Sequence, residues 1–126
     1  MKIETIYTED APEPVGPYAQ AKRVGDFVFC SGQIPMDQKL GKLITGDIES
    51  EATQVIENLK AVLEKAGASL ETAVKVTIYL TDLKDFEKVN NIYKDYFTTK
   101  PARSTVQVAA LPKGASVEIE FVASYP

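Results

Sequence analysis

Alternating apolar and polar residues predict the β-strands of this chain. The clearest case is residues 73–80 (AVKVTIYL), where Val74, Val76, Ile78 and Leu80 occupy every second position. A period of two is the β-strand period, because successive side chains point to opposite faces of a sheet. Five shorter segments are also expected to be strands: 2–7, 19–24, 27–31, 103–108 and 117–121. The Gly25-Asp26 pair predicts a hairpin turn between the second and third of them. Residues 27–30, apolar throughout, predict burial on both faces of the sheet.

Two segments have the helical spacing of three and four residues instead. The first starts near Glu49, with Asp47 as its N-cap and Gly67 as its stop. Its apolar stripe consists of Ala52, Val55, Ile56, Leu59, Val62, Leu63 and Ala66. The second helix opens at 81–85 and ends before Pro101, which cannot continue it. Its expected buried stripe is Leu83, Phe86, Val89, Tyr93, Tyr96 and Phe97.

This order of elements predicts an α+β domain over residues 1–126. Each helix follows a strand, so both helices should cover one face of a mixed β-sheet. The other face must then be polar or be covered by something else, and self-association is one solution. Two segments are expected to be loops: 37–46 at the surface, and the proline-rich 10–17, which is stiff and delivers Tyr18.

The amino-acid composition excludes several kinds of site and partner. The chain has 126 residues, a formal net charge of −4 and no histidine, which argues against zinc sites and histidine-dependent catalytic triads. Cys30 is the single cysteine, so no internal disulfide can form, and we expect it in the core. The acidic balance argues against a nucleic-acid or membrane partner. The N-terminus lacks the apolar core of a signal peptide, and we expect a cytoplasmic protein.

Charged residues in the last two strands form the candidate site. Arg103 shares one parity with Thr105 and Gln107, and Glu118 and Glu120 share one face of the next strand. The apolar parities, including Val106, are expected to face the core. If the two strands lie close together, Arg103 and one glutamate could line a single pocket. A guanidinium grips a carboxylate through two parallel hydrogen bonds. The alternative is a structural ion pair between Arg103 and a glutamate.

The spacing of these residues resembles the Rid family, the YjgF-like reactive intermediate deaminases. The matching segments are PARSTV (101–106), LP (111–112), VEI (117–119), GPY (16–18) and SGQIP (31–35). The resemblance implies a chorismate-mutase-like fold and a homotrimer whose sheets form a central β-barrel, with clefts between subunits. It also implies hydrolysis of enamines and imines, of the 2-aminoacrylate and 2-iminopropionate type, to 2-keto acids and ammonia. No cofactor and no metal is implied.

The resemblance also implies roles for individual residues. Arg103 would hold the substrate carboxylate, Glu118 would activate water, and Tyr18 would close the pocket. Because the family's cleft lies between subunits, Tyr18 could serve the Arg103 of a neighbouring chain. The remaining expected contacts are Ser31 and the backbone near Gly32 at the imine end, Thr105 at the wall, Asn90 on the second helix, and Glu120 as the alternative base. From the residues alone, the favoured interpretations are a packing aromatic for Tyr18, a turn hydroxyl for Ser31 and an exposed helical residue for Asn90.

One departure and two alternative functions remain. Many relatives carry cysteine where this chain has Thr105, which argues against an obligatory thiol nucleophile. Gln107 and Ala110 replace charged residues that are frequent in relatives. A non-catalytic keto-acid sensor or chaperone-like trimer would use the same arginine pocket. An endoribonuclease or translation inhibitor is a weaker alternative, because no histidine pair, basic stripe or RNA-reading aromatic motif is present.

Overall fold

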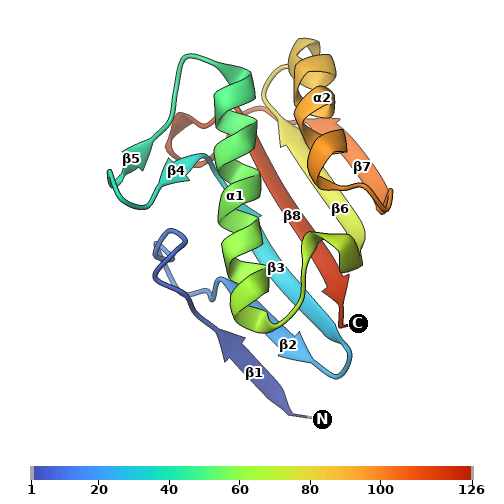
Figure 1. The fold of residues 1–126 in the computed structure, drawn as a ribbon. Helices are drawn as coiled ribbons and strands as arrows, with labels where there is room; N and C mark the ends of the chain where they lie inside the picture. Colours follow the sequence, from blue (N-terminus) through green and yellow to red (C-terminus); the bar gives the residue numbers. More distant parts are fainter. Residues whose placement is uncertain (1, 126) are drawn as a thin grey trace.

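The computed structural model describes residues 2–125 and contains one six-stranded mixed sheet, in the order β1-β2-β3-β8-β6-β7 (Figure 1). Its strands are β1 (Ile3–Ile6), β2 (Ala21–Val24), β3 (Phe27–Gln33), β6 (Ala73–Leu80), β7 (Ala102–Gln107) and β8 (Val117–Ser124). All neighbours are antiparallel except β6 and β7, which run parallel. The six strands predicted from periodicity are thus confirmed.

Two helices connect the strands. Helix α1 (Ile48–Ala66) begins at Asp47, whose side chain accepts a hydrogen bond from the Glu49 backbone N–H, and ends at Gly67 in the left-handed conformation. Both boundaries follow the predicted caps. Helix α2 (Phe86–Tyr96) follows the short 3₁₀ turn η2 (Leu83–Asp85). Two further 3₁₀ turns are η1 (Leu70–Thr72) and η3 (Pro112–Gly114). Neither α-helix in the described range is long and apolar enough to cross a membrane.

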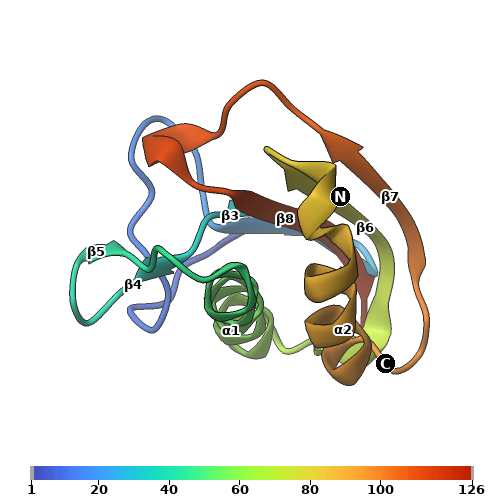
Figure 2. The same ribbon diagram turned by 90° about the horizontal axis from the view of Figure 1, so that it is seen from above.

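Both helices pack on the same face of the sheet, as Figure 2 shows from above. The core between the layers contains the buried side chains of α1 and the inward-facing positions of β3, β6 and β8, among them Val28, Cys30, Ile78 and Ile119. Cys30 lies in this core, as expected, and burial raises the pKa of its thiol to about 12. The predicted α+β architecture, two helices on one face of a mixed sheet, is therefore correct.

The opposite face of the sheet is only partly covered by this chain. Phe27 and Phe29 are 45% and 47% exposed on β3, so the expected burial of this strand on both faces is wrong for the single chain. Val106 on β7 is 42% exposed on the same side, and the expectation that its parity faces the core is also wrong. The reason is the register: Val106 pairs with Tyr79, whereas the buried Ile78 pairs with Thr105.

Three local predictions also require correction. Residues 37–46 contain a two-stranded hairpin of β4 (Met36–Asp37) and β5 (Lys42–Leu43), not only a loop. Strand β3 continues two residues beyond the predicted 27–31, through Gly32 and Gln33, and its pairing with β8 shifts register after Cys30. Leu83 and Phe86, expected in the buried stripe of the second helix, are 47% and 36% exposed.

Candidate functional site

Arg103 lies on the helix-facing side of β7, in a setting that orients its guanidinium. Its Nη1 donates a hydrogen bond of 2.7 Å to Oδ1 of Asn90 on α2. The guanidinium carbon lies 4.8 Å from the centre of the Tyr93 ring and 5.4 Å from that of Phe86. Aromatic faces attract a cation, so three side chains of α2 fix this arginine in place. Asn90 is half-buried and holds Arg103, which excludes the alternative of an exposed helical asparagine.

The positive charge of Arg103 is not neutralised within residues 2–125. The one ion pair in this part of the chain joins the exposed Lys2 and Glu4, 4.0 Å apart. Arg103 therefore forms no ion pair with Glu118 or Glu120, and the structural alternative is excluded for the single chain. A guanidinium has five N–H donors, and one hydrogen bond leaves the others available to a ligand.

A shallow pocket opens beside this guanidinium, lined by Leu83, Phe86, Arg103 and Thr105. Within residues 2–125, the only buried side-chain polar atoms without a hydrogen-bond partner are two hydroxyls near the arginine, those of Tyr93 and Thr105. Burial raises the pKa of Tyr93, and the nearby Arg103 opposes that shift, so the phenol stays neutral. Buried polar groups without partners are rare, and their concentration here indicates a place for a polar ligand or water.

Glu118 lies on the opposite face of the sheet, beside the end of β3. Burial first, and then the charge of Glu120, raise the pKa of its carboxyl above the ordinary value. Glu120 in turn accepts a hydrogen bond from the hydroxyl of Tyr79, a contact that raises the pKa of Tyr79 to about 12. The two glutamates are thus distinct: Glu120 is engaged by a neighbour, and Glu118 is a half-buried carboxylate with a raised pKa.

Gly32 makes room for the Glu118 carboxylate. A Cβ at position 32 would lie 2.5 Å from Oε2 of Glu118, closer than real contacts of this kind. Ser31 precedes it, and its hydroxyl donates a hydrogen bond of 2.6 Å to the Ala19 carbonyl oxygen. The hydroxyl proton is therefore used within the fold, while its oxygen can still accept a hydrogen bond.

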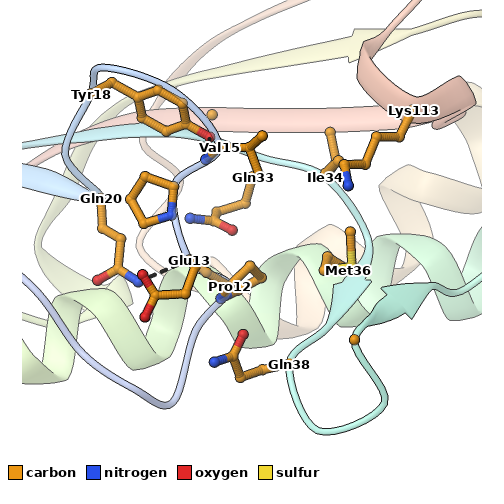
Figure 3. Close-up of a pocket in the computed structure, with 13 residues that line it drawn as sticks. Pro12, Glu13, Val15, Tyr18, Gln20, Gln33, Ile34, Met36, Gln38 and Lys113 are labelled. Carbon is orange, nitrogen blue, oxygen red and sulfur yellow. Dashed lines mark hydrogen bonds between the residues drawn. The ribbon is translucent and has the colours of Figure 1, made fainter.

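Tyr18 is 53% exposed and is not the packing aromatic that its sequence position allowed. Its hydroxyl accepts a hydrogen bond of 3.2 Å from the Val15 backbone N–H. Figure 3 shows the ring at the end of the proline-rich loop, over a cavity that reaches toward Met36 and Lys113.

The prediction that Arg103 and a glutamate line one pocket within the chain is wrong. Arg103 pairs with Val76, whose side chain is buried under the helices, whereas Glu118 pairs with Tyr79 on the other face. Strand β6 also separates their strands. The candidate residues therefore fall into two groups on opposite faces of the sheet. We call them the arginine half-site (Arg103, Asn90, Tyr93, Thr105) and the glutamate half-site (Glu118, Gly32, Ser31).

Comparison with known proteins identifies the family. Residues 8–125 match the family model described as endoribonuclease L-PSP. A RutC family protein of Pyrococcus abyssi is 53% identical over 98% of both chains. A solved structure from Yersinia pestis, described as a member of the conserved Rid protein family, superposes with a TM-score of 0.95 at 46% identity, over 98% of this chain and 99% of that one. This chain belongs to the Rid family. A further relative, from Dermatophagoides farinae, is named 2-iminobutanoate/2-iminopropanoate deaminase and is 48% identical over 93% of this chain and 92% of its own.

Two residues of this Rid chain were missed by sequence reasoning. Tyr93 was placed in the buried stripe of α2. Its packing against Arg103 was not predicted, because the local sequence pattern does not show which residues of β7 face α2. Gln33, buried at the end of β3 and lining a pocket near Tyr18, belongs to the SGQIP segment, but nothing in that segment indicated a role for its side chain.

Proposed function

We propose that this Rid protein hydrolyses reactive enamine and imine intermediates, of the 2-aminoacrylate and 2-iminopropionate type, to 2-keto acids and ammonia. Arg103 carries the proposal, since it is a half-buried, oriented guanidinium without a carboxylate partner among residues 2–125. Such a group is suited to the carboxylate of a small 2-imino acid. The deaminase named among the relatives supports the same reaction class.

The active site would be completed by a second copy of the chain. In one chain the two half-sites lie on opposite faces of the sheet, and a small substrate cannot contact both. The face that carries Glu118 also exposes Phe27, Phe29 and Val106, an apolar surface suited to burial against another copy. We infer a homotrimer in which the sheets pack as a central barrel, as in a chorismate-mutase-like assembly, with clefts between subunits.

Glu118 would then act as the proton-transfer group. Its carboxylate takes a proton from water as the oxygen bonds to C2 of the imine, and the C=N π electrons move to nitrogen. Glu118 returns that proton to the nitrogen, which gives a carbinolamine. Transfer of the hydroxyl proton to the amino group through the same carboxylate then lets the C–N bond break as the C=O bond forms, which releases ammonia and leaves the keto acid. An imine carbon is already electrophilic, so positioning and one such group suffice, and no cofactor is required. A raised pKa makes Glu118 a stronger base than an ordinary carboxylate.

The test measures keto-acid and ammonia release from imines generated in situ by an amino-acid oxidase. Wild type should accelerate release, whereas Arg103→Ala and Glu118→Gln should not. Glu64→Gln on the exposed side of α1 is the matched control for Glu118→Gln and should keep full activity. Each variant is checked for unchanged oligomeric mass. No acceleration with any imine, combined with keto-acid binding that depends on Arg103, would favour a sensor instead.

A further inference from the structure

Asn58 is a buried polar residue within the apolar stripe of α1. Its side chain is 2% exposed, and its stripe neighbours Val55, Leu59 and Val62 are fully buried apolar residues. An asparagine carries two N–H donors and a carbonyl acceptor, and burial of such a group is unfavourable unless hydrogen bonds satisfy it. The partners of this amide therefore explain why a polar side chain occupies the core side of the helix.

The amide of Asn58 joins α1 to the segment that follows β3, which leads into β4 beside the helix (Figures 1 and 2). Its Nδ2 donates to two backbone carbonyl oxygens, that of Met36 at 2.9 Å and that of Ile34 at 3.3 Å. Its Oδ1 accepts a hydrogen bond of 2.9 Å from Nε2 of Gln54, one turn earlier on the same helix. Both ends of the amide are thus engaged, and the Gln54 contact directs the Nδ2 end toward the backbone carbonyls.

The segment held by Asn58 comes directly after a β-bulge. Cys30 and Gln33 are three residues apart on β3, whereas their partners on β8 are two residues apart. The extra residue is accommodated at Ser31 and Gly32, and a bulge of this kind disrupts the ladder locally and bends the strand. The position of this stretch therefore depends on contacts outside the ladder, and Asn58 provides two of them just beyond the bulge.

The position of this bulge determines the space beside the Glu118 carboxylate. A Cβ at Gly32 would lie 2.5 Å from Oε2 of Glu118, so no side chain separates this stretch of backbone from the carboxylate. A small shift of the bulge would therefore displace the carboxylate or open a gap beside it. Displacement of a reacting group by about 1 Å can reduce a rate about 100-fold. The geometry of Glu118 is thus sensitive to whatever holds the bulge in place.

We propose that Asn58 is a positioning residue for imine hydrolysis: by fixing the backbone of Ile34 and Met36, it holds the bulge at Gly32 against the Glu118 carboxylate. The proposal rests on the hydrolase function and on the role of Glu118 proposed above. Loss of the Asn58 amide should impair proton transfer and leave binding of the substrate carboxylate unchanged. The reason is that Arg103 lies on β7, which β8 and β6 separate from β3.

The experiment compares wild type with Asn58→Leu, which has a similar side-chain volume but no amide. The parameters kcat and KM are measured with the imine of alanine, and the affinity for its product, pyruvate, is measured separately by calorimetry. We expect kcat to fall roughly 10–100-fold, while KM and the affinity for pyruvate stay close to their wild-type values. A loss confined to kcat means that an interaction made only in the transition state has been removed.

Two further variants keep the test decisive if Asn58→Leu is unstable. Asp47→Ala, at the N-cap of the same helix, is the matched control for lost stability: it should lower the unfolding temperature and retain the wild-type kcat. Gln54→Leu keeps Asn58 but removes the hydrogen bond that orients its amide, so it should show a smaller loss that is also confined to kcat. Thermal unfolding and oligomeric mass are measured for every variant.

The possible failures are distinguishable. If folded Asn58→Leu keeps the wild-type kcat, or if its affinity for pyruvate falls together with kcat, Asn58 does not act through Glu118 and the hydrolase function stands. The same conclusion follows if Asp47→Ala loses as much kcat as Asn58→Leu, because lost stability then explains the effect. If Asn58→Leu does not fold, an unchanged kcat in Gln54→Leu refutes the proposal. If wild type accelerates no imine, both proposals fall.

Discussion

Two inactive variants of this protein should restore activity to each other when they assemble together. The perturbation is a mixture of Arg103→Ala, which retains Glu118, and Glu118→Gln, which retains Arg103. Within one chain, strand β6 lies between the strands of these two residues, and their partners on β6, Val76 and Tyr79, are three positions apart. Two strand spacings of ~4.8 Å and three residues of ~3.3 Å place the two Cα atoms roughly 14 Å apart, with side chains on opposite faces.

That separation determines the expected magnitude. Reacting groups must come within about 3–3.5 Å of each other, which a single chain with this geometry cannot provide for a small imino acid. If each site takes Arg103 from one subunit and Glu118 from its neighbour, random assembly of equal amounts makes a site intact with probability ½ × ½. We therefore expect about a quarter of wild-type activity from the mixture in a closed symmetric oligomer.

The assay is keto-acid release after co-expression or co-refolding, with native mass spectrometry to show that both variants share oligomers. A second mixture gives an independent check. In this mixture, wild type and the double variant Arg103→Ala/Glu118→Gln are present in equal amounts. Compared with pure wild type at the same total protein concentration, it should show about a quarter of the activity if sites are shared, and about a half if each chain works alone. Mixed oligomers without recovery, together with half activity in the dilution, would refute the shared site.

The remaining predictions concern Glu118, Gly32 and Asp47. The raised pKa of Glu118 should place the acidic limb of the pH profile of kcat/KM above the ordinary carboxyl value of 4.5. Glu120→Gln removes a neighbouring negative charge and should move this limb to lower pH. An unmoved limb would show that Glu120 does not influence the group that titrates. Because a raised carboxyl pKa favours the folded state only below its ordinary value and loses that contribution as pH rises, Glu118→Gln should unfold at a higher temperature than wild type at pH 7, although it is inactive. Gly32→Ala should displace the flexible Glu118 carboxylate and lower kcat/KM with little change in thermal unfolding, and normal kinetics would contradict the close approach. Asp47→Ala removes the N-cap of α1 and should cost ~0.5–2 kcal/mol in denaturant unfolding, with activity per folded molecule unchanged.

Local patterns in the sequence were sufficient to predict most of the fold. The alternation in 73–80 and the stripe and caps of α1 are properties of neighbouring residues, so they could be identified without knowing what those elements pack against. The hairpin of β4 and β5 was missed because its strands have two residues each, too short for a period of two to be visible.

The candidate residues were also selected from the sequence, but their arrangement was not. Arg103, Glu118, Tyr18 and Gly32 were all named from motifs, yet their division into two half-sites depends on one fact, the parallel pairing of β7 with β6. This register places Thr105 beside the buried Ile78 and turns Val106 outward. Parity along a strand shows which residues share a face, but not which of the two faces meets the helices.

The sequence by itself thus determined the α+β class, the boundaries of α1 and the residue types available for chemistry, because these depend on contacts within a few positions along the chain. Only the tertiary structure decided that Arg103 has no carboxylate partner among the described residues and that Glu118 lies on the other face of the sheet. Those properties depend on which distant segments meet, and the segments meet through the order and register of the strands in the sheet.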